Sequence, residues 1–141
     1  MSVEENKAIV RRLIEEMDRG NWDSFEELCS PDYLAHYPGS PTPLTREEQK
    51  EAAKASYAGF PDFHHTIHDV IAEDDKVVFR TTDRATHKGE FQGIAPTGRG
   101  VEFGVIGIFR IAGGKIAETW LEADLLGLMQ QLGAIPAPGQ G

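Results

Sequence analysis

Apolar residues recur at helical spacing near the start of the chain. The positions i, i+3, i+4 and i+7 are all apolar, which places one hydrophobic stripe on a helix: Val10, Leu13, Ile14 and Met17. Ser2 and Glu5 have the spacing of a capping box, and Gly20 stands where a left-handed C-terminal cap is expected. The pattern therefore predicts a helix over residues 2–19 that buries one face.

Two further helices and a loop are expected before residue 60. A short helix begins near Asn21 or Asp23 and ends at Pro31. Residues 31–44 contain four prolines and predict an irregular, partly buried loop. Thr45 and Glu48 form a second capping box, which opens a helix that runs to about residue 57.

The hydrophobic period changes from about 3.6 to 2 after Pro61. Four strands are predicted, joined by a tight acidic turn, a long Gly- and Pro-rich loop and a Gly-Gly hairpin: 63–73, 76–88, 100–111 and 115–124. A short helix over 125–132 and a tail over 136–141 follow. Helices first and a sheet afterwards indicate a single α+β domain over 1–135, in which a curved antiparallel sheet wraps the N-terminal helix as a cone. Such a cone has an apolar interior with one open mouth, a common place for a ligand.

The charge balance narrows the function classes. The chain has 14 Lys and Arg against 23 Asp and Glu, a net charge of −9, whereas a nucleic-acid or anionic-membrane binder needs a basic face. No apolar run approaches the ~20 residues of a membrane span. The single cysteine, Cys29, cannot form an internal disulfide, so a reducing cytoplasm is expected.

Several short motifs occur in a characteristic order. They read FPDF, IAE, THKGEF, GIAPTG, GKI and WLEADLLGL, at residues 60–63, 71–73, 86–91, 93–98, 114–116 and 120–128. Together they resemble the SnoaL-like polyketide cyclase (ester cyclase) family, which has the nuclear transport factor 2-like fold. The resemblance runs from the first helix to Gly133 and implies a cystatin-like α+β barrel.

The same resemblance implies a cofactor-free aldol ring closure on a polyketide ester, with an aspartate as general acid/base near the mouth of the cone. Asp124 is the position that matches, although Glu118 and Glu122 could serve instead. Asp124 also precedes an apolar helix, so it has a second interpretation as an N-cap. The two roles are compatible.

Trp120 shares a strand face with Glu118, Glu122 and Asp124. Trp120 is either a core residue or a flat wall for a planar ligand, and Glu122 is a candidate substrate contact. An acidic face of this kind either lines a wet cavity or meets solvent. The pattern does not decide which face of this strand points inward.

The histidines supply further candidates. His65 shares a face with Phe63 and Ile67, which predicts that it points inward as a pocket acid or hydrogen-bond donor, or as a satisfied buried histidine. His64 and His68 then point outward, on the order of 13 Å apart, so no metal site is expected there. We expect no cofactor.

Other residues are expected around the mouth of the cone. His87 ends the second strand beside the long loop, on the same face as Asp83, and is a second candidate donor to an enolate. Phe60 and Phe63 would shape an apolar pocket. Tyr33 and His36 lie in the Pro-rich loop and would either wall the mouth or pack the loop down.

Three kinds of function fit these expectations. The first is the cyclase, acting on a small, polyketide-like molecule. The second is another enzyme of the same fold, an isomerase, a dehydratase or an epoxide hydrolase, the last of which needs an Asp-Arg-Asp relay. The third is a non-catalytic binding module.

Outward apolar residues predict a homodimer through the sheet: Val78, Ile106 and Ile108.

Overall fold

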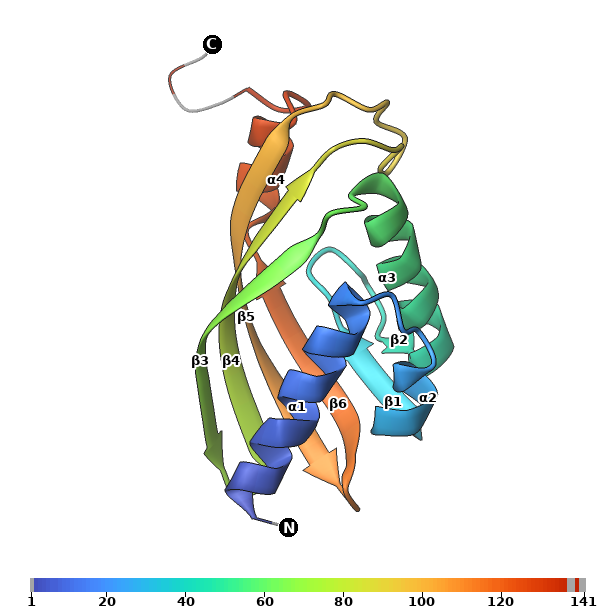
Figure 1. Ribbon diagram of the computed structural model, residues 1–141, viewed down its shortest axis with the longest axis vertical. Coiled ribbons are helices and arrows are strands. Elements are labelled where there is room, and N and C mark those ends of the chain that lie inside the picture. The colour runs from blue at the N-terminus through green and yellow to red at the C-terminus, as the bar shows by residue number, and fades with distance from the viewer. Residues whose placement is uncertain (1, 137–138, 140–141) are drawn as a thin grey trace.

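The computed structural model describes residues 2–136 and Gly139 (Figure 1). Within that part of the chain the elements follow in this order: α1 (Val3–Asp18), α2 (Ser24–Leu28), β1 (Cys29–His36), β2 (Leu44–Thr45), α3 (Arg46–Gly59), β3 (His64–Glu73), β4 (Lys76–Thr86), β5 (Gly100–Ala112), β6 (Lys115–Ala123) and α4 (Leu125–Gln131). The α+β fold is confirmed. The tail expected over 136–141 lies largely outside the described residues.

The six strands form one curved sheet in the order β2-β1-β6-β5-β4-β3. All neighbours are antiparallel except β1 and β6, which pair parallel. Helix α1 lies across the concave side of the sheet, and α3 stands beside β1 and β2 (Figure 1). The sheet does not close on itself, because β2 and β3 remain its two edges.

The prediction of a loop over residues 31–44 is wrong, because β1 and β2 occupy its two ends. Pro31 argued against a strand here, since proline cannot donate a hydrogen bond to the neighbouring strand. The structure accommodates it at a register shift, where β1 leaves its pairing with β6 between Cys29 and Leu34. Only the middle of the segment is free of regular structure.

The helix starts follow the sequence signals. Ser2 accepts the Glu5 backbone N–H while the Glu5 carboxylate accepts the Ser2 N–H, and Thr45 and Glu48 repeat this arrangement at α3. Gly20 has φ of +76°, the left-handed conformation that glycine adopts without strain. The caps therefore fix where α1 and α3 begin.

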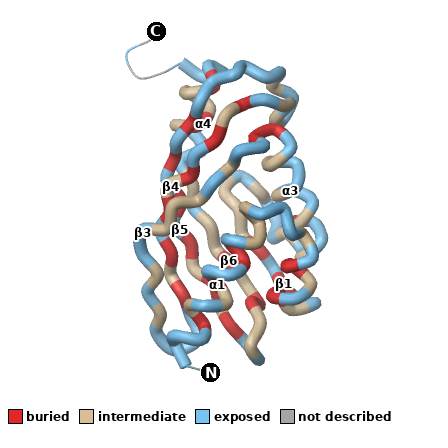
Figure 2. The backbone as a smooth tube through the Cα atoms, in the orientation of Figure 1, coloured by how far each residue is buried: buried red, intermediate tan, exposed pale blue. Residues whose placement is uncertain are grey.

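The core lies between the concave face of the sheet and α1 (Figure 2). Alternate residues of β4 and β5 point into it: Val77, Phe79, Ala85, Val101, Phe103, Val105, Phe109 and Ile111. Gly107 belongs to the same face, and a side chain there would overlap the Phe79 ring and Leu121. On β6 the inward positions are Thr119 and Leu121, which decides the question that the pattern left open.

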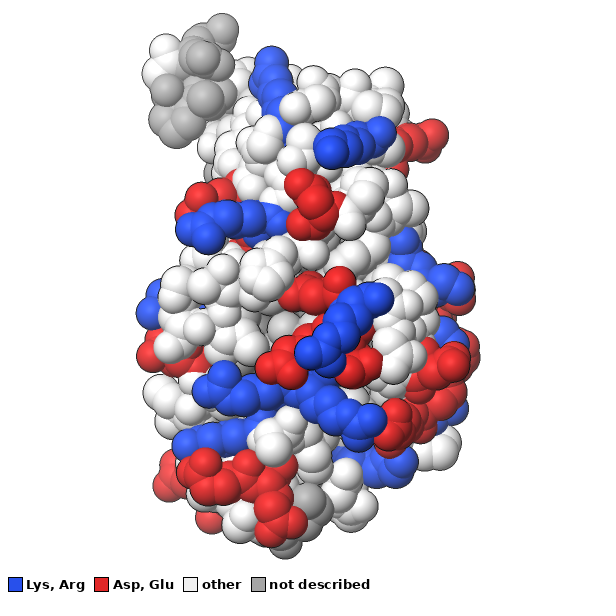
Figure 3. All heavy atoms as spheres, in the orientation of Figure 1, with Lys and Arg blue, Asp and Glu red and all other residues white. Residues whose placement is uncertain are grey.

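Charged residues of both signs are mixed over the surface seen in Figure 3, where Lys and Arg side chains lie among Asp and Glu side chains. Within the described residues no helix is both long enough and apolar enough to cross a membrane.

Candidate functional site

Three ionisable side chains meet inside the cone, and we call them the interior row: Asp18, His65 and Asp83. Asp18 is the last residue of α1, His65 is on β3 and Asp83 is its register partner on β4. His65 Nδ1 lies 2.8 Å from Asp18 Oδ1, and His65 Nε2 lies 3.6 Å from Asp83 Oδ2. The imidazole thus stands between two carboxylates, with Nδ1–H donated to the first.

The carboxylate of Asp18 is the fixed end of the interior row. It accepts the Tyr57 hydroxyl at 2.6 Å and the His65 backbone N–H at 3.0 Å, besides the imidazole. Burial works against its charged form, but the bonds from His65 and Tyr57 outweigh burial and hold the pKa of Asp18 below its usual value. Asp18 therefore stays ionised and fixes the orientation of His65.

Asp83 is the more deeply buried carboxylate of the interior row. Asp83 is only 3% exposed, and its Oδ1 accepts a hydrogen bond from the Thr81 hydroxyl at 2.9 Å. Burial raises the pKa of Asp83. Burial also disfavours the charged form of His65, but the bond to Asp18 and the negative charge of Asp83 prevail, so the pKa of His65 is raised too. Both groups of the His65–Asp83 pair therefore keep a proton to a higher pH than they would in water.

Aromatic rings pack on one another in the interior from this row toward His87. The Phe63 ring lies 5.1 Å from His65 and 6.1 Å from Phe103, and the Phe60 ring lies 5.3 Å from His87. Phe60 and Phe63 themselves meet edge to face at 6.4 Å. These two phenylalanines, expected to shape a pocket, thus lie between the two expected histidines.

Tyr33 is a buried core residue. Its hydroxyl donates to Thr119 Oγ1 at 2.8 Å, and burial raises its pKa. Of the two expected roles of Tyr33, packing is the one observed: its side chain points from β1 into the core and does not reach the mouth.

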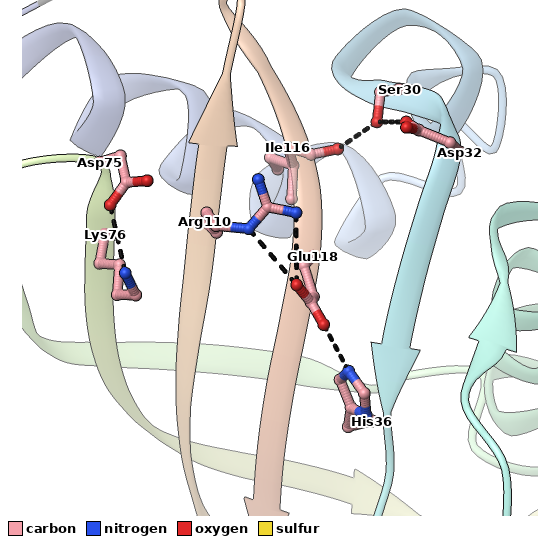
Figure 4. Close-up of polar contacts among 8 residues, drawn as sticks. All are labelled: Ser30, Asp32, His36, Asp75, Lys76, Arg110, Ile116 and Glu118. Carbon is pink, nitrogen blue, oxygen red and sulfur yellow. Dashed lines mark hydrogen bonds and ion pairs between the residues drawn. The ribbon is translucent and has the colours of Figure 1, made fainter.

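His36 lies outside the cone, and this corrects its expected place as well (Figure 4). Its Nε2 is 2.7 Å from Glu118 Oε2, and the other carboxylate oxygen of Glu118 accepts from Arg110 at 3.3 Å. The His36 ring stacks on Trp120 with centroids 5.4 Å apart. Trp120 is therefore part of an outer polar cluster and does not line the interior.

Asp124 is exposed, which contradicts its expected place inside the cavity. Its Oδ1 accepts the Gly127 backbone N–H at 2.9 Å, so it caps α4. The reason is the alternation of β6, which turns Thr119 and Leu121 inward and sends Glu122 and Asp124 outward. Both acids border a shallow outer groove of ~380 Å³ beside Gly104.

The sequence pattern carries no signal for Asp18 or Tyr57, and it places Asp83 on the face of His87 without linking it to His65. Asp83 contacts His65 rather than His87, because a β-bulge at His68 shifts the pairing of β3 and β4 by one residue. That bulge has a faint trace in the sequence, where inward Phe63, His65 and Ile67 are followed by inward Val70 and Ala72. No spacing signal links Asp18 to either strand.

The family of the chain is shown by a match between its sequence and a family profile. The profile of the SnoaL-like polyketide cyclases matches residues 7–132. The chain belongs to this family. The SnoaL-like match begins within α1 and runs through α4, so it includes the interior row and the outer cluster.

Solved structures of SnoaL-like proteins superpose closely on the chain. IdmH from Streptomyces antibioticus, assigned as a polyketide cyclase, is 32% identical with a TM-score of 0.83, over 91% of this chain and 98% of IdmH. AclR from Streptomyces galilaeus, assigned as a hydroxylase, is 27% identical with a TM-score of 0.88, over 96% and 85%. TsrD from Streptomyces laurentii is 28% identical with a TM-score of 0.84, over 96% and 99%. Among curated proteins none matches this chain significantly.

Proposed function

We propose that the chain is a cofactor-free enzyme that closes a ring in a small, polyketide-like carbonyl compound by an aldol-type reaction, with the His65–Asp83 pair as the acid/base centre. The observation that carries this proposal is the buried interior row, in which one histidine stands between two aspartates. Membership of the SnoaL-like polyketide cyclases supports the substrate class.

The proton transfers of such a reaction return the His65–Asp83 pair to its starting protonation state. At the start Asp83 is a carboxylate and His65 an imidazolium. Asp83 takes a proton from the carbon beside a carbonyl, and the resulting enolate attacks a second carbonyl in the same molecule. The new alkoxide takes the proton of His65, and Asp83 then returns its proton to His65. No net proton and no electron leaves the site, so no cofactor is needed.

The environment of the pair suits these steps. A buried carboxylate with a raised pKa is a stronger base than one in water. A fixed imidazolium stabilises the developing negative oxygen without reorganisation. Asp18 acts through His65 as a positioning residue, since its bonds hold the imidazole in one orientation.

We place the general base at Asp83 rather than at Asp124. Asp124 is exposed and its carboxylate is engaged by the first turn of α4, so it lies outside the interior of the cone. Epoxide hydrolysis is a weaker alternative, because a histidine stands where an Asp-Arg-Asp relay needs an arginine. An isomerase would share the first proton transfer, and a binding module would show none.

The proposal is tested by proton abstraction itself. The enzyme is incubated with 1-tetralone in D₂O, and deuterium at the carbon beside the carbonyl is followed by NMR. We expect a catalysed, bell-shaped pH profile. Its acid limb lies above the ordinary range of an aspartate because the pKa of Asp83 is raised, and its alkaline limb lies above that of a free histidine because the pKa of His65 is raised.

His65→Gln is the matching variant, because it removes the alkaline limb and keeps Asp83. A profile without catalysis would favour the binding module. An unchanged alkaline limb in His65→Gln would remove His65 from the reaction.

We also propose a cytoplasmic homodimer joined through the outer face of the sheet. Ile106 is 52% exposed in the middle of that face, with Val78 and Ile108 beside it on the paired strands. Light scattering should give a particle mass about twice the 15.5 kDa of one chain. The Ile106→Asp variant should give the mass of a single chain. Particles of one chain's mass in the unsubstituted protein would refute the dimer.

A further inference from the structure

His87 is a buried titratable residue that the proton cycle does not use. It follows β4 on the inward face, is 0% exposed, and lies beneath the loop of residues 88–98. Two backbone hydrogen bonds join His87 to the end of this loop. The His87 N–H donates to Arg99 O and the Gly98 N–H donates to His87 O, each at 2.9 Å. The ring is therefore held in place independently of the interior row.

The hydrogen bonds of His87 define its tautomer. The Thr97 backbone N–H donates to Nδ1 at 3.2 Å, and the Thr97 hydroxyl oxygen lies 3.0 Å from the same nitrogen. A backbone N–H cannot accept, so Nδ1 bears no proton, and in the neutral ring the proton is on Nε2. Nε2 is fully buried and has no hydrogen-bond partner among the described residues. Buried polar atoms are normally paired, so an orphaned donor of this kind points to a partner that the chain does not supply.

The surroundings of this donor indicate the class of partner. Phe60 lies against His87, and Phe60, Phe63 and His65 continue ring to ring toward the interior row at 6.4 and 5.1 Å. Such a lining favours flat, apolar molecules. An N–H donor at its end favours a carbonyl or phenol oxygen, and not a cation.

Strand geometry sets the length of that molecule. His87 follows Asp83 by four residues on the same face, which places their Cα atoms on the order of 13 Å apart, and the two side chains leave the strand in the same direction. Allowing a contact of about 3 Å at each end leaves about 7 Å, the length of a skeleton of two or three fused rings.

We propose that His87 Nε2–H binds the distal oxygen of a planar, fused-ring carbonyl substrate, at the opposite end of the aromatic lining from the His65–Asp83 pair. The position of the reacting end rests on the proposed function, whereas the oxygen site at His87 does not. Phe91 packs on Phe60 with centroids 5.0 Å apart, so the Phe91 ring must move aside to admit the molecule.

Two probes that differ only in the oxygen test this site. 9-Fluorenone has a carbonyl, and fluorene has the same fused skeleton without it. Their dissociation constants are measured by NMR titration of the full chain. We expect fluorenone to bind about three- to tenfold more tightly, the value of one net hydrogen bond.

Two variants of His87 separate its nitrogens. His87→Gln places an amide N–H near the position of Nε2 and should keep the preference for fluorenone. His87→Asn places its amide near Nδ1, so it can still accept from Thr97 but loses the distal donor, and should bind the two probes equally. Equal binding by the unsubstituted protein, or an unchanged preference in a folded His87→Asn, would overturn the proposal.

The same titration on Asp83→Asn distinguishes this site from the proposed reaction. The preference for fluorenone should remain in that variant, because binding at His87 needs no proton transfer. If tetralone exchange fails while the preference holds, only the proposed function falls. If exchange behaves as expected while the preference is missing, only the site at His87 falls.

Discussion

Asp18→Asn should destabilise the fold more than a single surface substitution can. The carboxylate accepts three hydrogen bonds, from the Tyr57 hydroxyl, the His65 backbone and the His65 ring. An amide removes the charge and can retain only part of this set. Bonds to a charged group contribute about 1.5–3 kcal/mol each, and loss of a partner in a buried pair costs about 3–5 kcal/mol. We expect a loss of about 2–4 kcal/mol, since the amide keeps some of the bonds.

The loss should depend on pH in a defined direction. The pKa of Asp18 is lowered by folding, so its contribution is present above the unfolded value and disappears as pH falls through the folded one. The pKa of His65 is raised, so its contribution is present below the unfolded value and disappears as pH rises through the folded one. The difference between the two proteins should therefore be greatest between about pH 4.5 and 6.5.

The assay is thermal and urea unfolding of both proteins across this range. At about 3–4 °C per kcal/mol for a chain of this size, the melting temperature should fall by about 6–16 °C. Asp69→Asn is the control, because Asp69 pairs with Arg80 at 2.7 Å on the exposed outer face and should change stability by less than about 0.5 kcal/mol. Equal effects of the two substitutions, or a difference that does not vary with pH, would refute the reasoning.

Three further predictions concern other parts of the fold. Gly107→Ala should cost about 1–3 kcal/mol because a Cβ would overlap the Phe79 ring, whereas Gly104→Ala meets open space and should be nearly neutral in urea unfolding. Asp124→Ala should lose about 0.5–2 kcal/mol through its cap on α4 while leaving tetralone exchange unchanged; a stable but inactive variant would restore Asp124 to the chemistry. Burial raises the pKa of Cys29 to about 12, so iodoacetamide at pH 8 should label it only in unfolded protein, and rapid labelling of the folded chain would contradict its burial.

The fold was predictable because its signals are local. The capping box at Ser2 and Glu5 and the two-residue alternation of β4 and β5 each act over a few residues, and the structure follows both. Strand β1 was not predicted because its sequence signal is weak. It contains Pro31 and is irregular near that residue, and its partner β6 lies far along the chain. Parallel pairing between distant segments leaves no turn to read.

The site was less predictable for the same reason. His65 could be placed inside from the alternation around it, but its partners could not. Asp18 reaches it from the end of α1, and Asp83 reaches it only because one bulge resets the register of β3. On β6 both faces carry residues that a cavity could use, so the direction of Asp124 depended on how the whole sheet curves.

The central claim is that the buried Asp83, and not the exposed Asp124, removes the proton. Its most direct test is the rate of deuterium incorporation into 1-tetralone at one pH for Asp83→Asn and Asp124→Asn, both first shown to be folded. Removal of a general base costs about 10²- to 10⁴-fold. The account predicts such a loss in Asp83→Asn and the full rate in Asp124→Asn. The reverse order, or equal rates in the two variants, would contradict it.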